Sequence, residues 1–273
     1  PNRTPKTRML DFYERELGFD CVELNFTYYS LPVPRTMEQL VRKTGDGFEF
    51  AVRSHQDMTH DIWQDEKRTM LKDVDPVFAA FRSGIAPLAE TGRLGCVLVQ
   101  LPSFFWPNPK HADYIRRLPG RLPGVPVTVE FRNQAWVKDE TYRLLEETGL
   151  GWCVVDEPQL PRLMPFTPAR TSDTGYFRFH GRNRNWFRAS RSERYDYLYS
   201  NDELTGFVEP VKTVAAGAKQ TFVFFNNCHA GSAARNAILM KQLLGLVDEL
   251  TPVQSRVVSG ELDRSGEQGG LFA

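Results

Sequence analysis

Polar and charged side chains stand at or just beyond the ends of short apolar runs in this sequence. Because side chains two residues apart on a strand point to the same face, Glu23 shares a face with Asn25, and Glu130 with Arg132. The same alternation adds a further set of polar side chains to that face: Arg53, Gln100, Asp156, Arg178, His180, Arg182 and Asn226. We expect these groups to form a ring around one cavity.

Carboxylates and a histidine in such a ring are the groups that general acid–base catalysis requires. A carboxylate in a partly desolvated pocket can have a raised pKa, which suits Glu130 or Glu23 to the role of base. His180 is the proton shuttle in this hypothesis, and Asp156 completes the candidate catalytic set. Developing negative charge would be bound by three arginines, Arg53, Arg132 and Arg182. The pattern favours a hydrolase or an isomerase, and it does not decide between them.

The charges of the ring have a structural interpretation as well. Its acids, Glu23, Glu130 and Asp156, could simply neutralise its arginines, Arg53, Arg132 and Arg178. Desolvating such charges costs several kcal/mol, which offsets much of their attraction, so a buried network stabilises a fold only weakly. We therefore favour a functional site, and structural pairing stays open as the alternative.

A second constellation leads into a helix expected at 233–248. The segment 226–232 reads Asn-Asn-Cys-His-Ala-Gly-Ser, and the free N–H groups at a helix start favour an anion. Gly231 would let the backbone approach a ligand closely. Asn227 and Ser232 are the other candidate ligand-binding residues. The pattern predicts a phosphate site, since barrels of this class often bind phosphate after their last strands. In the structural alternative, Ser232 caps the helix and Asn227 turns the chain.

The segment 178–199 interleaves arginine with aromatic residues. Two of its arginines, Arg182 and Arg184, suit bidentate phosphate binding, and we expect them to contact the same ligand. A mixture of this kind can also follow a nucleic-acid backbone and stack on bases. It can equally form a lid over a smaller anionic ligand, or a surface packed by cation–π contacts. All three interpretations stay open, and the lid is favoured over nucleic acid.

Several residues belong to the types that bind zinc or manganese: His55, His60, Glu130, Asp156, His180 and His229. They show neither H-x-H nor H-E-x-x-H spacing, and the nearby arginines would crowd positive charge around a metal ion. We predict no cofactor and no metal ligands, and a divalent metal is the less favoured alternative.

The positions of these residues depend on alternating strands and helices. Short apolar runs predict seven strands, at 21–25, 48–53, 96–101, 126–131, 151–156, 176–180 and 221–226. Longer amphipathic stretches predict helices at about 6–17, 35–44, 65–90, 109–117, 139–148, 202–216 and 233–248. Such alternation is typical of βα units around a parallel sheet. A doubly wound sheet is the alternative, but no G-x-G-x-x-G fingerprint follows a strand.

The fold class that we predict is α/β, a (β/α)8 TIM-like barrel whose first strand is missing from this chain. In this fold, active sites lie at the C-terminal ends of the strands. We expect one barrel domain over residues 1–250 and a flexible tail over 251–273. Helix ends support the element positions: Asn108 reads as an N-cap, Ser200 with Glu203 as a capping box, and Gly149 as a helix stop.

Motifs in this order resemble a known family. They are Glu23-Leu-Asn-Phe-Thr-Tyr-Tyr29 with Pro32, Thr59-His60, Gln100-Leu-Pro102, Val129-Glu-Phe-Arg132, Arg178-Phe-His-Gly-Arg182 and Phe224-Phe-Asn-Asn227. Together they look like the YecE-like proteins, domain-of-unknown-function family 72. The resemblance runs from about residue 5 to 241 and implies a TIM-barrel fold, without implying an activity. The family usually opens with a strand that ends in a Gly-x-Ser-Gly-Trp-like turn, and this sequence does not show that turn.

Composition narrows the choice of partners. The 34 Lys and Arg residues balance 34 Asp and Glu residues, which argues against charge-driven capture of nucleic acid by the whole molecule. No apolar run approaches the ~20 residues of a membrane helix. Four cysteines without C-x-x-C spacing indicate reduced thiols, and we expect a cytoplasmic protein without a membrane partner.

The sequence thus predicts a protein that binds a phosphate-bearing or otherwise anionic ligand at the barrel mouth and that is a candidate hydrolase or isomerase. One alternative is a nucleic-acid-binding or repair-related protein that uses segment 178–199. Another is a ligand-binding barrel without catalytic activity. The oligomeric state is not predicted.

Overall fold

The computed structural model describes residues 8–186 and 190–261 of the chain. The chain divides into two compact units. Unit 1 consists of Pro1–Phe19, Val154–Ala169 and Tyr176–Ala273, and unit 2 of Asp20–Cys153 and Arg170–Gly175. Residues 187–189 of the arginine-rich segment 178–199 lie outside the described residues, as do residues 262–273 of the predicted tail.

Seven strands occur among the described residues, close to the predicted positions. They are β1 (Cys21–Leu24), β2 (Glu49–Arg53), β3 (Leu94–Gln100), β4 (Val127–Glu130), β5 (Gly151–Asp156), β6 (Thr174–Phe179) and β7 (Gln220–Phe225). Their order in the sheet follows their order in the chain. A doubly wound sheet would reverse that order at a switch point. The prediction of an α/β fold of the TIM-barrel class is therefore confirmed.

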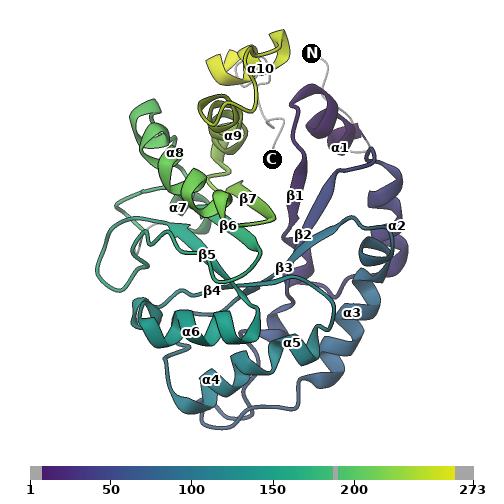
Figure 1. Ribbon diagram of the computed structural model, residues 1–273, viewed down its shortest axis with the longest axis vertical. Helices are drawn as coiled ribbons and strands as arrows, with labels where there is room; N and C mark the ends of the chain where they lie inside the picture. The colour runs from purple at the N-terminus through teal and green to yellow at the C-terminus, as the bar shows by residue number, and fades with distance from the viewer. Residues whose placement is uncertain (1–7, 187–189, 262–273) are drawn as a thin grey trace. The chain divides into compact units, whose positions relative to one another are not determined.

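In the described part of the chain, helices lie between successive strands, except between β5 and β6. Those of unit 2 are η3 (Phe26–Tyr28), α2 (Pro34–Arg42), η4 (Gln56–Met58), α3 (Asp75–Glu90), α4 (Pro109–Arg116), α5 (Leu118–Arg121), η5 (Gln134–Trp136) and α6 (Asp139–Thr148). Those of unit 1 are α1 (Met9–Asp11), η2 (Phe12–Glu16), α7 (Arg191–Arg194), α8 (Asn201–Ala216), η6 (His229–Gly231), α9 (Ser232–Leu243) and α10 (Pro252–Ser259). In unit 2, α2 to α6 lie on the outer side of β1 to β4 (Figure 1).

The parallel strands of unit 2 bring polar residues to one end. Glu23 of β1 is paired with Ala51 of β2, and Gln100 of β3 with Glu130 of β4. The middle of β3 is apolar and buried, with the sequence Cys-Val-Leu-Val before Gln100. Parallel strands with helices on their outer side need such apolar middles, so polar residues are confined to the strand ends.

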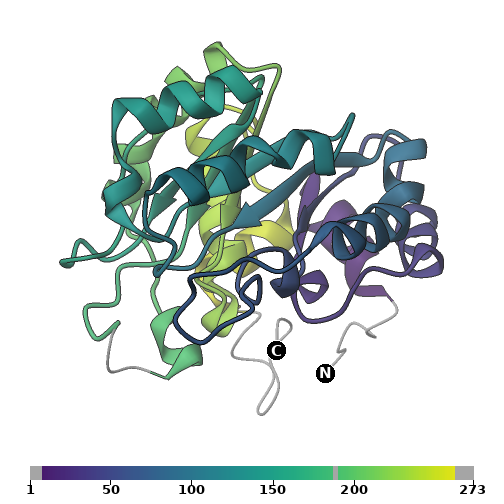
Figure 2. The same cartoon turned by 90° about the horizontal axis from the view of Figure 1, so that it is seen from below.

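The helix predicted at 65–90 is shorter in the structure, because α3 begins only at Asp75. Residues 65–70 instead form a tight turn around the Asp65 side chain. Its carboxylate accepts hydrogen bonds from the backbone N–H groups of Thr69 and Met70. Asp competes for backbone donors in this way outside helices, and this local competition explains the error. Figure 2 shows the region between β2 and α3 as an irregular dark-blue loop.

A close approach of the chain to α3 requires a glycine inside that helix. A Cβ atom on Gly84 would lie 2.2 Å from the carbonyl oxygen of Pro32. The segment before α2 therefore lies directly against α3, and α2 and α3 pack together within unit 2. The loop that follows β1 is held in place by this contact.

The predicted flexible tail is partly wrong, because residues 252–259 form α10. Thr251 and Gln254 make a capping box, and Pro252 stands at the start of the helix. Val257 packs into a core of unit 1 together with Leu17 and Ile238. The tail is rich in Gly and Ser, and the prediction therefore missed the apolar residues that stand at helical spacing in α10 and pack into the core.

No helix among the described residues has the length and apolar character needed to cross a membrane. The cysteines at positions 21, 96, 153 and 228, all among the described residues, are not joined by disulfides.

Candidate functional site

The end of β1 is tied to the end of β2 in unit 2. The buried Thr27 hydroxyl lies 2.8 Å from the carbonyl oxygen of Leu24 and 2.5 Å from that of Arg53. Asn25 donates from Nδ2 to Oε1 of Glu23 at 2.9 Å, which orients the carboxylate. Glu23, Asn25 and Arg53 are each partly exposed. The turn after β1 thus holds a carboxylate and a guanidinium group at neighbouring strand ends.

Both arginines of this end of unit 2 are held by neighbouring side chains. The guanidinium carbon of Arg53 lies 4.1 Å from the centre of the Tyr28 ring, a cation–π contact. Arg132 donates from Nη1 to Oε1 of Glu130 at 3.0 Å. The Glu130 side chain is 0% exposed and that of Arg132 15%, so Arg132 is the partly accessible member of the pair.

Burial and nearby arginines keep the His60 side chain neutral. Burial lowers its pKa, the charge of Arg53 lowers it further, and Arg132 acts in the same direction. Together these effects outweigh Asp61 and Glu130 and bring the pKa to about 4. The imidazole is therefore neutral at pH 7, with Nδ1 at 2.9 Å from the Thr59 hydroxyl. A neutral imidazole can hydrogen-bond to a ligand without adding charge.

We call these residues the arginine cluster of unit 2: Glu23, Asn25, Tyr28, Arg53, His60, Glu130 and Arg132. Gln100 lies beside it in sequence register, since it is paired with Glu130 on the neighbouring strand, and it is partly exposed. The cluster offers guanidinium groups for an anion, a neutral imidazole, and carboxylates of different exposure. Anion binding and proton transfer both need such groups.

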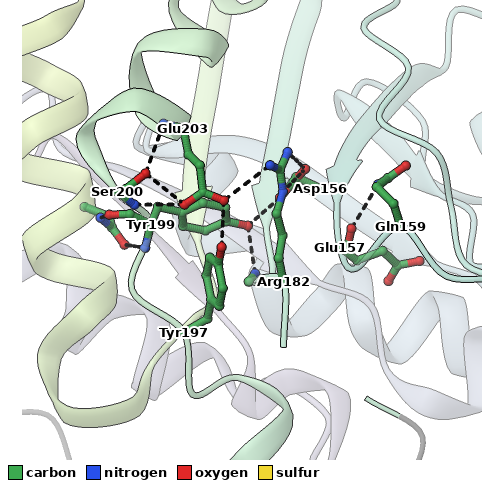
Figure 3. Close-up of polar contacts among 10 residues, drawn as sticks. Asp156, Glu157, Gln159, Arg182, Tyr197, Tyr199, Ser200 and Glu203 are labelled. Carbon is green, nitrogen blue, oxygen red and sulfur yellow. Dashed lines mark hydrogen bonds and ion pairs between the residues drawn. The ribbon is translucent and has the colours of Figure 1, made fainter. Parts of the chain in front are cut away.

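Unit 1 contains a separate network of polar contacts around Asp156, at the end of β5 (Figure 3). Arg182 donates to this carboxylate from Nε and from Nη2, with Nη2–Oδ1 at 2.7 Å. The Tyr199 hydroxyl donates to Oδ2 of Asp156 at 2.6 Å and accepts from the Gly181 N–H at 2.8 Å. Burial raises the pKa of Asp156, although the hydrogen bonds from Arg182 and Tyr199 oppose that rise.

Glu203 extends the network from the start of α8. Its Oε1 accepts from the Tyr197 hydroxyl at 2.6 Å and from Nη1 of Arg182 at 3.3 Å, as Figure 3 shows. Its Oε2 accepts from the Ser200 N–H, which completes the predicted capping box. Burial opposes ionisation of Glu203, but these hydrogen bonds and the Arg182 charge outweigh it and lower the pKa.

A cavity of about 800 Å³ borders this network within unit 1. Its lining includes Gln159, Arg182, Asn183, Arg184, Tyr197 and Glu203. The side chain of Arg182 is bound by two carboxylates, whereas Arg184 is exposed at the cavity. Asp156 is thus paired with Arg182, an arginine that the structural alternative did not name, and Arg184 has a position open to a ligand.

The remaining ring residues of unit 1 are mostly buried. His180 is 1% exposed, and its Nδ1 lies 3.4 Å from Nδ2 of Asn226. Arg178 is 2% exposed. Because His180 and Arg178 have so little exposed surface, a ligand reaches them only by displacing other groups.

The loop before α9 contains the residues of the predicted anion site, but the side-chain amide of Asn227 binds other parts of the protein. Gly231 has φ 75° and directly precedes Ser232, the first residue of α9. The N-cap position of α9 is occupied by Gly231 and not by Ser232. Asn227 is fully buried and donates to the carbonyl oxygen of Tyr197 and to Oδ1 of Asn236, both at 2.8 Å. Asn227 therefore fixes the segment that carries Tyr197.

Within the described residues, no three His, Cys, Asp or Glu side chains lie close enough together to hold a metal ion.

Comparison with known sequences assigns the chain to a family. The family described as "Protein of unknown function DUF72" matches residues 1–257. The chain belongs to the DUF72 family. The UPF0759 protein YunF of Bacillus subtilis (strain 168) is 30% identical over 264 residues, which are 91% of this chain and 89% of YunF. The UPF0759 protein YecE of Escherichia coli (strain K12) is 27% identical over 164 residues, 59% of this chain and 56% of YecE.

Solved structures agree with the assignment to DUF72. A DUF72 family protein of Thermotoga maritima MSB8 has a TM-score of 0.82 and 42% identity, covering 90% of this chain and 92% of its own. A DUF72 family protein of Enterococcus faecalis V583 has a TM-score of 0.74 and 28% identity, covering 85% and 88%. The resemblance inferred from the ordered motifs is confirmed.

In this DUF72 protein, the structure groups the predicted site residues by unit. Unit 2 brings together Glu23, Asn25, Arg53, Glu130 and Arg132, with Gln100 beside them. Unit 1 joins Asp156 to Arg182, and His180 to Asn226. None of Tyr28, Tyr197 and Tyr199 was predicted as a site residue, and Glu203 was predicted only to cap a helix. For Tyr197 and Tyr199, the arginine-rich surroundings were the one signal available.

Proposed function

We propose that this DUF72 protein binds a small phosphate-bearing or otherwise anionic ligand at the arginine cluster of unit 2. The observation that carries the proposal is the position of two partly exposed arginines, Arg53 and Arg132, at strand ends of unit 2, where the Tyr28 ring and the Glu130 carboxylate contact them. Burial and the charge of Arg53 lower the pKa of the nearby His60, so the place is partly desolvated and the imidazole adds no charge of its own. Charge-assisted hydrogen bonds to an anion are strong in such surroundings.

The two carboxylates of the cluster take different roles in this proposal. Glu130 is fully buried and bonded to Arg132, so it positions that guanidinium group. Glu23 is partly exposed and oriented by Asn25, so it is the general acid or base that reaches the ligand. His60 is neutral and donates or accepts a hydrogen bond at the anion. The reaction would be a hydrolysis or an isomerisation.

Isothermal titration with inorganic phosphate at pH 7.5 tests the binding step. We expect Arg53→Met and Arg132→Met each to weaken binding by at least about tenfold, because each removes a charge-assisted contact. Arg42→Met is the matched control, since the Arg42 side chain is 79% exposed on α2. Equal affinity of all four proteins would overturn the proposal.

A measurement of turnover distinguishes an enzyme from a ligand-binding barrel without catalytic activity. Phosphomonoesters and sugar phosphates are incubated with the wild type and with Glu23→Gln. We expect the substitution to abolish turnover while phosphate affinity changes less than about threefold. Turnover that survives Glu23→Gln would exclude Glu23 as the base, and a lack of turnover by the wild type on every ester would favour the non-catalytic alternative.

Nucleic acid is an alternative anionic ligand, because segment 178–199 is rich in arginine and tyrosine. Binding of a single-stranded oligonucleotide would weaken steeply with salt concentration. We expect no such binding at physiological ionic strength, since the net charge of the chain is zero. A steep salt dependence that vanishes in Arg184→Met would favour the nucleic-acid alternative.

A further inference from the structure

A continuous series of aromatic rings runs across three loops of unit 2. The rings of Tyr28 and Tyr29 are 4.9 Å apart, and that of His60 lies 5.1 Å from Tyr28. Phe104 follows at 6.4 Å from His60. The four residues come from the turns after β1, β2 and β3, so each follows a different strand. We call them the ring array: Tyr28, Tyr29, His60 and Phe104.

An arginine covers a ring at two places of the array. Arg53 lies over Tyr28 at 4.1 Å, and Arg68 over Phe104 at 3.5 Å. Arg68 adopts φ 58°, a left-handed conformation that is unfavourable for a residue with a side chain. The array is therefore flanked by two arginines. The hydrogen bonds of Asp65 hold the turn that carries one of them, Arg68.

Tyr29 is the most exposed member of the array. It is 60% exposed, and Phe26, three residues before it, is 45% exposed. Rings as exposed as these remove little apolar surface from water, so packing alone gives them little stabilising value. Large exposed aromatic side chains beside polar and charged groups are typical of ligand-binding surfaces.

We infer that the ligand carries a planar unsaturated ring, joined to its anionic group, and that this ring stacks on Tyr29 of the ring array. The inference rests on the proposed function, because the anion is the part that Arg53 and Arg132 bind. Tyr28 links the two halves of the site: it contacts Arg53 on one side and Tyr29 on the other. A ligand bound at Arg53 therefore reaches Tyr29 by extending past one ring, that of Tyr28.

The inference distinguishes stacking from mere apolar contact. A planar π-system gains from offset or edge-to-face contact with tyrosine, whereas a saturated ring of similar size gains only from burial. Phenyl phosphate and cyclohexyl phosphate share their charge and approximate size and differ in that property. Cyclohexyl phosphate is also the more apolar of the two, so burial alone would favour it.

Titration of the wild type with inorganic phosphate, phenyl phosphate and cyclohexyl phosphate tests the inference. We expect phenyl phosphate to bind on the order of tenfold more tightly than cyclohexyl phosphate, the range that base–aromatic stacking gives. In Tyr29→Leu the two esters should bind equally, while Tyr29→Phe, which keeps the ring, should retain the preference. Inorganic phosphate should bind all three proteins alike.

Each result has a distinct meaning. Phosphate binding without a preference for phenyl over cyclohexyl phosphate would overturn the ring inference and leave the anion site intact. A preference that persists in Tyr29→Leu would also overturn it, since the ring would then stack elsewhere. Failure of phosphate and both esters to bind would overturn both proposals. The wild-type comparison needs no variant and so does not depend on variant folding.

Discussion

Asp156 and Tyr199 are joined by a hydrogen bond of 2.6 Å, although 43 residues separate them in the chain. Both are buried, and the same tyrosine hydroxyl accepts the N–H of Gly181. The hydroxyl therefore connects the end of β5, the turn after β6 and the segment before α8. Arg182 binds the other oxygen of Asp156. In unit 1, this contact gives the acid and the arginine a structural role.

Removing that hydroxyl should destabilise the protein. In Tyr199→Phe, the Gly181 N–H and the Asp156 carboxylate lose a buried partner, and we expect a loss of about 2–3 kcal/mol in the free energy of unfolding. Tyr197→Phe is the matched control, because Tyr197 is only half-buried and water can replace its hydroxyl. We expect it to lose about 0.5–1 kcal/mol. Urea denaturation measures both values, and equal losses would refute the assignment.

Glycine at position 84 is required by the approach of Pro32. Alanine normally stabilises a helix interior relative to glycine, but here its Cβ would lie 2.2 Å from a backbone oxygen. We expect Gly84→Ala to cost about 1–3 kcal/mol. Gly206 of α8 has nothing within 4 Å of its Cβ position, so Gly206→Ala should stabilise by about 0.5–1 kcal/mol. Thermal denaturation that shifts both variants in the same direction would contradict the packing of α3.

The histidine of the arginine cluster should make stability depend on pH. Because the pKa of His60 is about 4 in the folded protein and its ordinary value is 6.5, the unfolded chain binds the proton more readily between these values. The stabilising contribution of a neutral His60 is therefore present above about pH 6.5 and is lost as pH falls towards 4. Discounted for partial exposure, the loss is about 2 kcal/mol.

His60→Gln isolates this contribution from those of the carboxylates. We expect the wild type to lose about 2 kcal/mol more than the variant between pH 7 and pH 4, measured by urea denaturation. Asp156 acts in the opposite direction, because its raised pKa favours the protonated folded state at low pH. It contributes equally in both proteins, so the difference between them reports His60. Parallel pH profiles would show that His60 is not held neutral.

The strand positions follow from the sequence because apolar runs such as 96–101 must be buried on both sides. Polar residues such as Arg53 and Glu130 can then stand only at the strand ends. The approximate positions of these polar residues in each unit can therefore be predicted without knowledge of tertiary contacts. Capping residues locate helices equally well, since their hydrogen bonds lie within one turn, as Asn108 and Ser200 show.

Long-range partners are not encoded in local spacing. Glu203 carries the sequence signal of a capping box and also binds Arg182 and Tyr197, which no periodicity indicates. Tyr199 meets Asp156 only after the intervening chain has folded. The boundary errors have local causes, namely the side-chain hydrogen bonds of Asp65 and the apolar face of α10.

The pKa of His60 in the presence of phosphate tests the central claim most directly. Its imidazole resonances, assigned by comparison with His60→Gln, are followed by NMR from pH 3.5 to 7 with and without saturating phosphate. An anion bound by Arg53 and Arg132 offsets their charge, so we expect the pKa to rise from about 4 by at least about half a unit. An unchanged pKa at saturating phosphate would contradict anion binding at the arginine cluster.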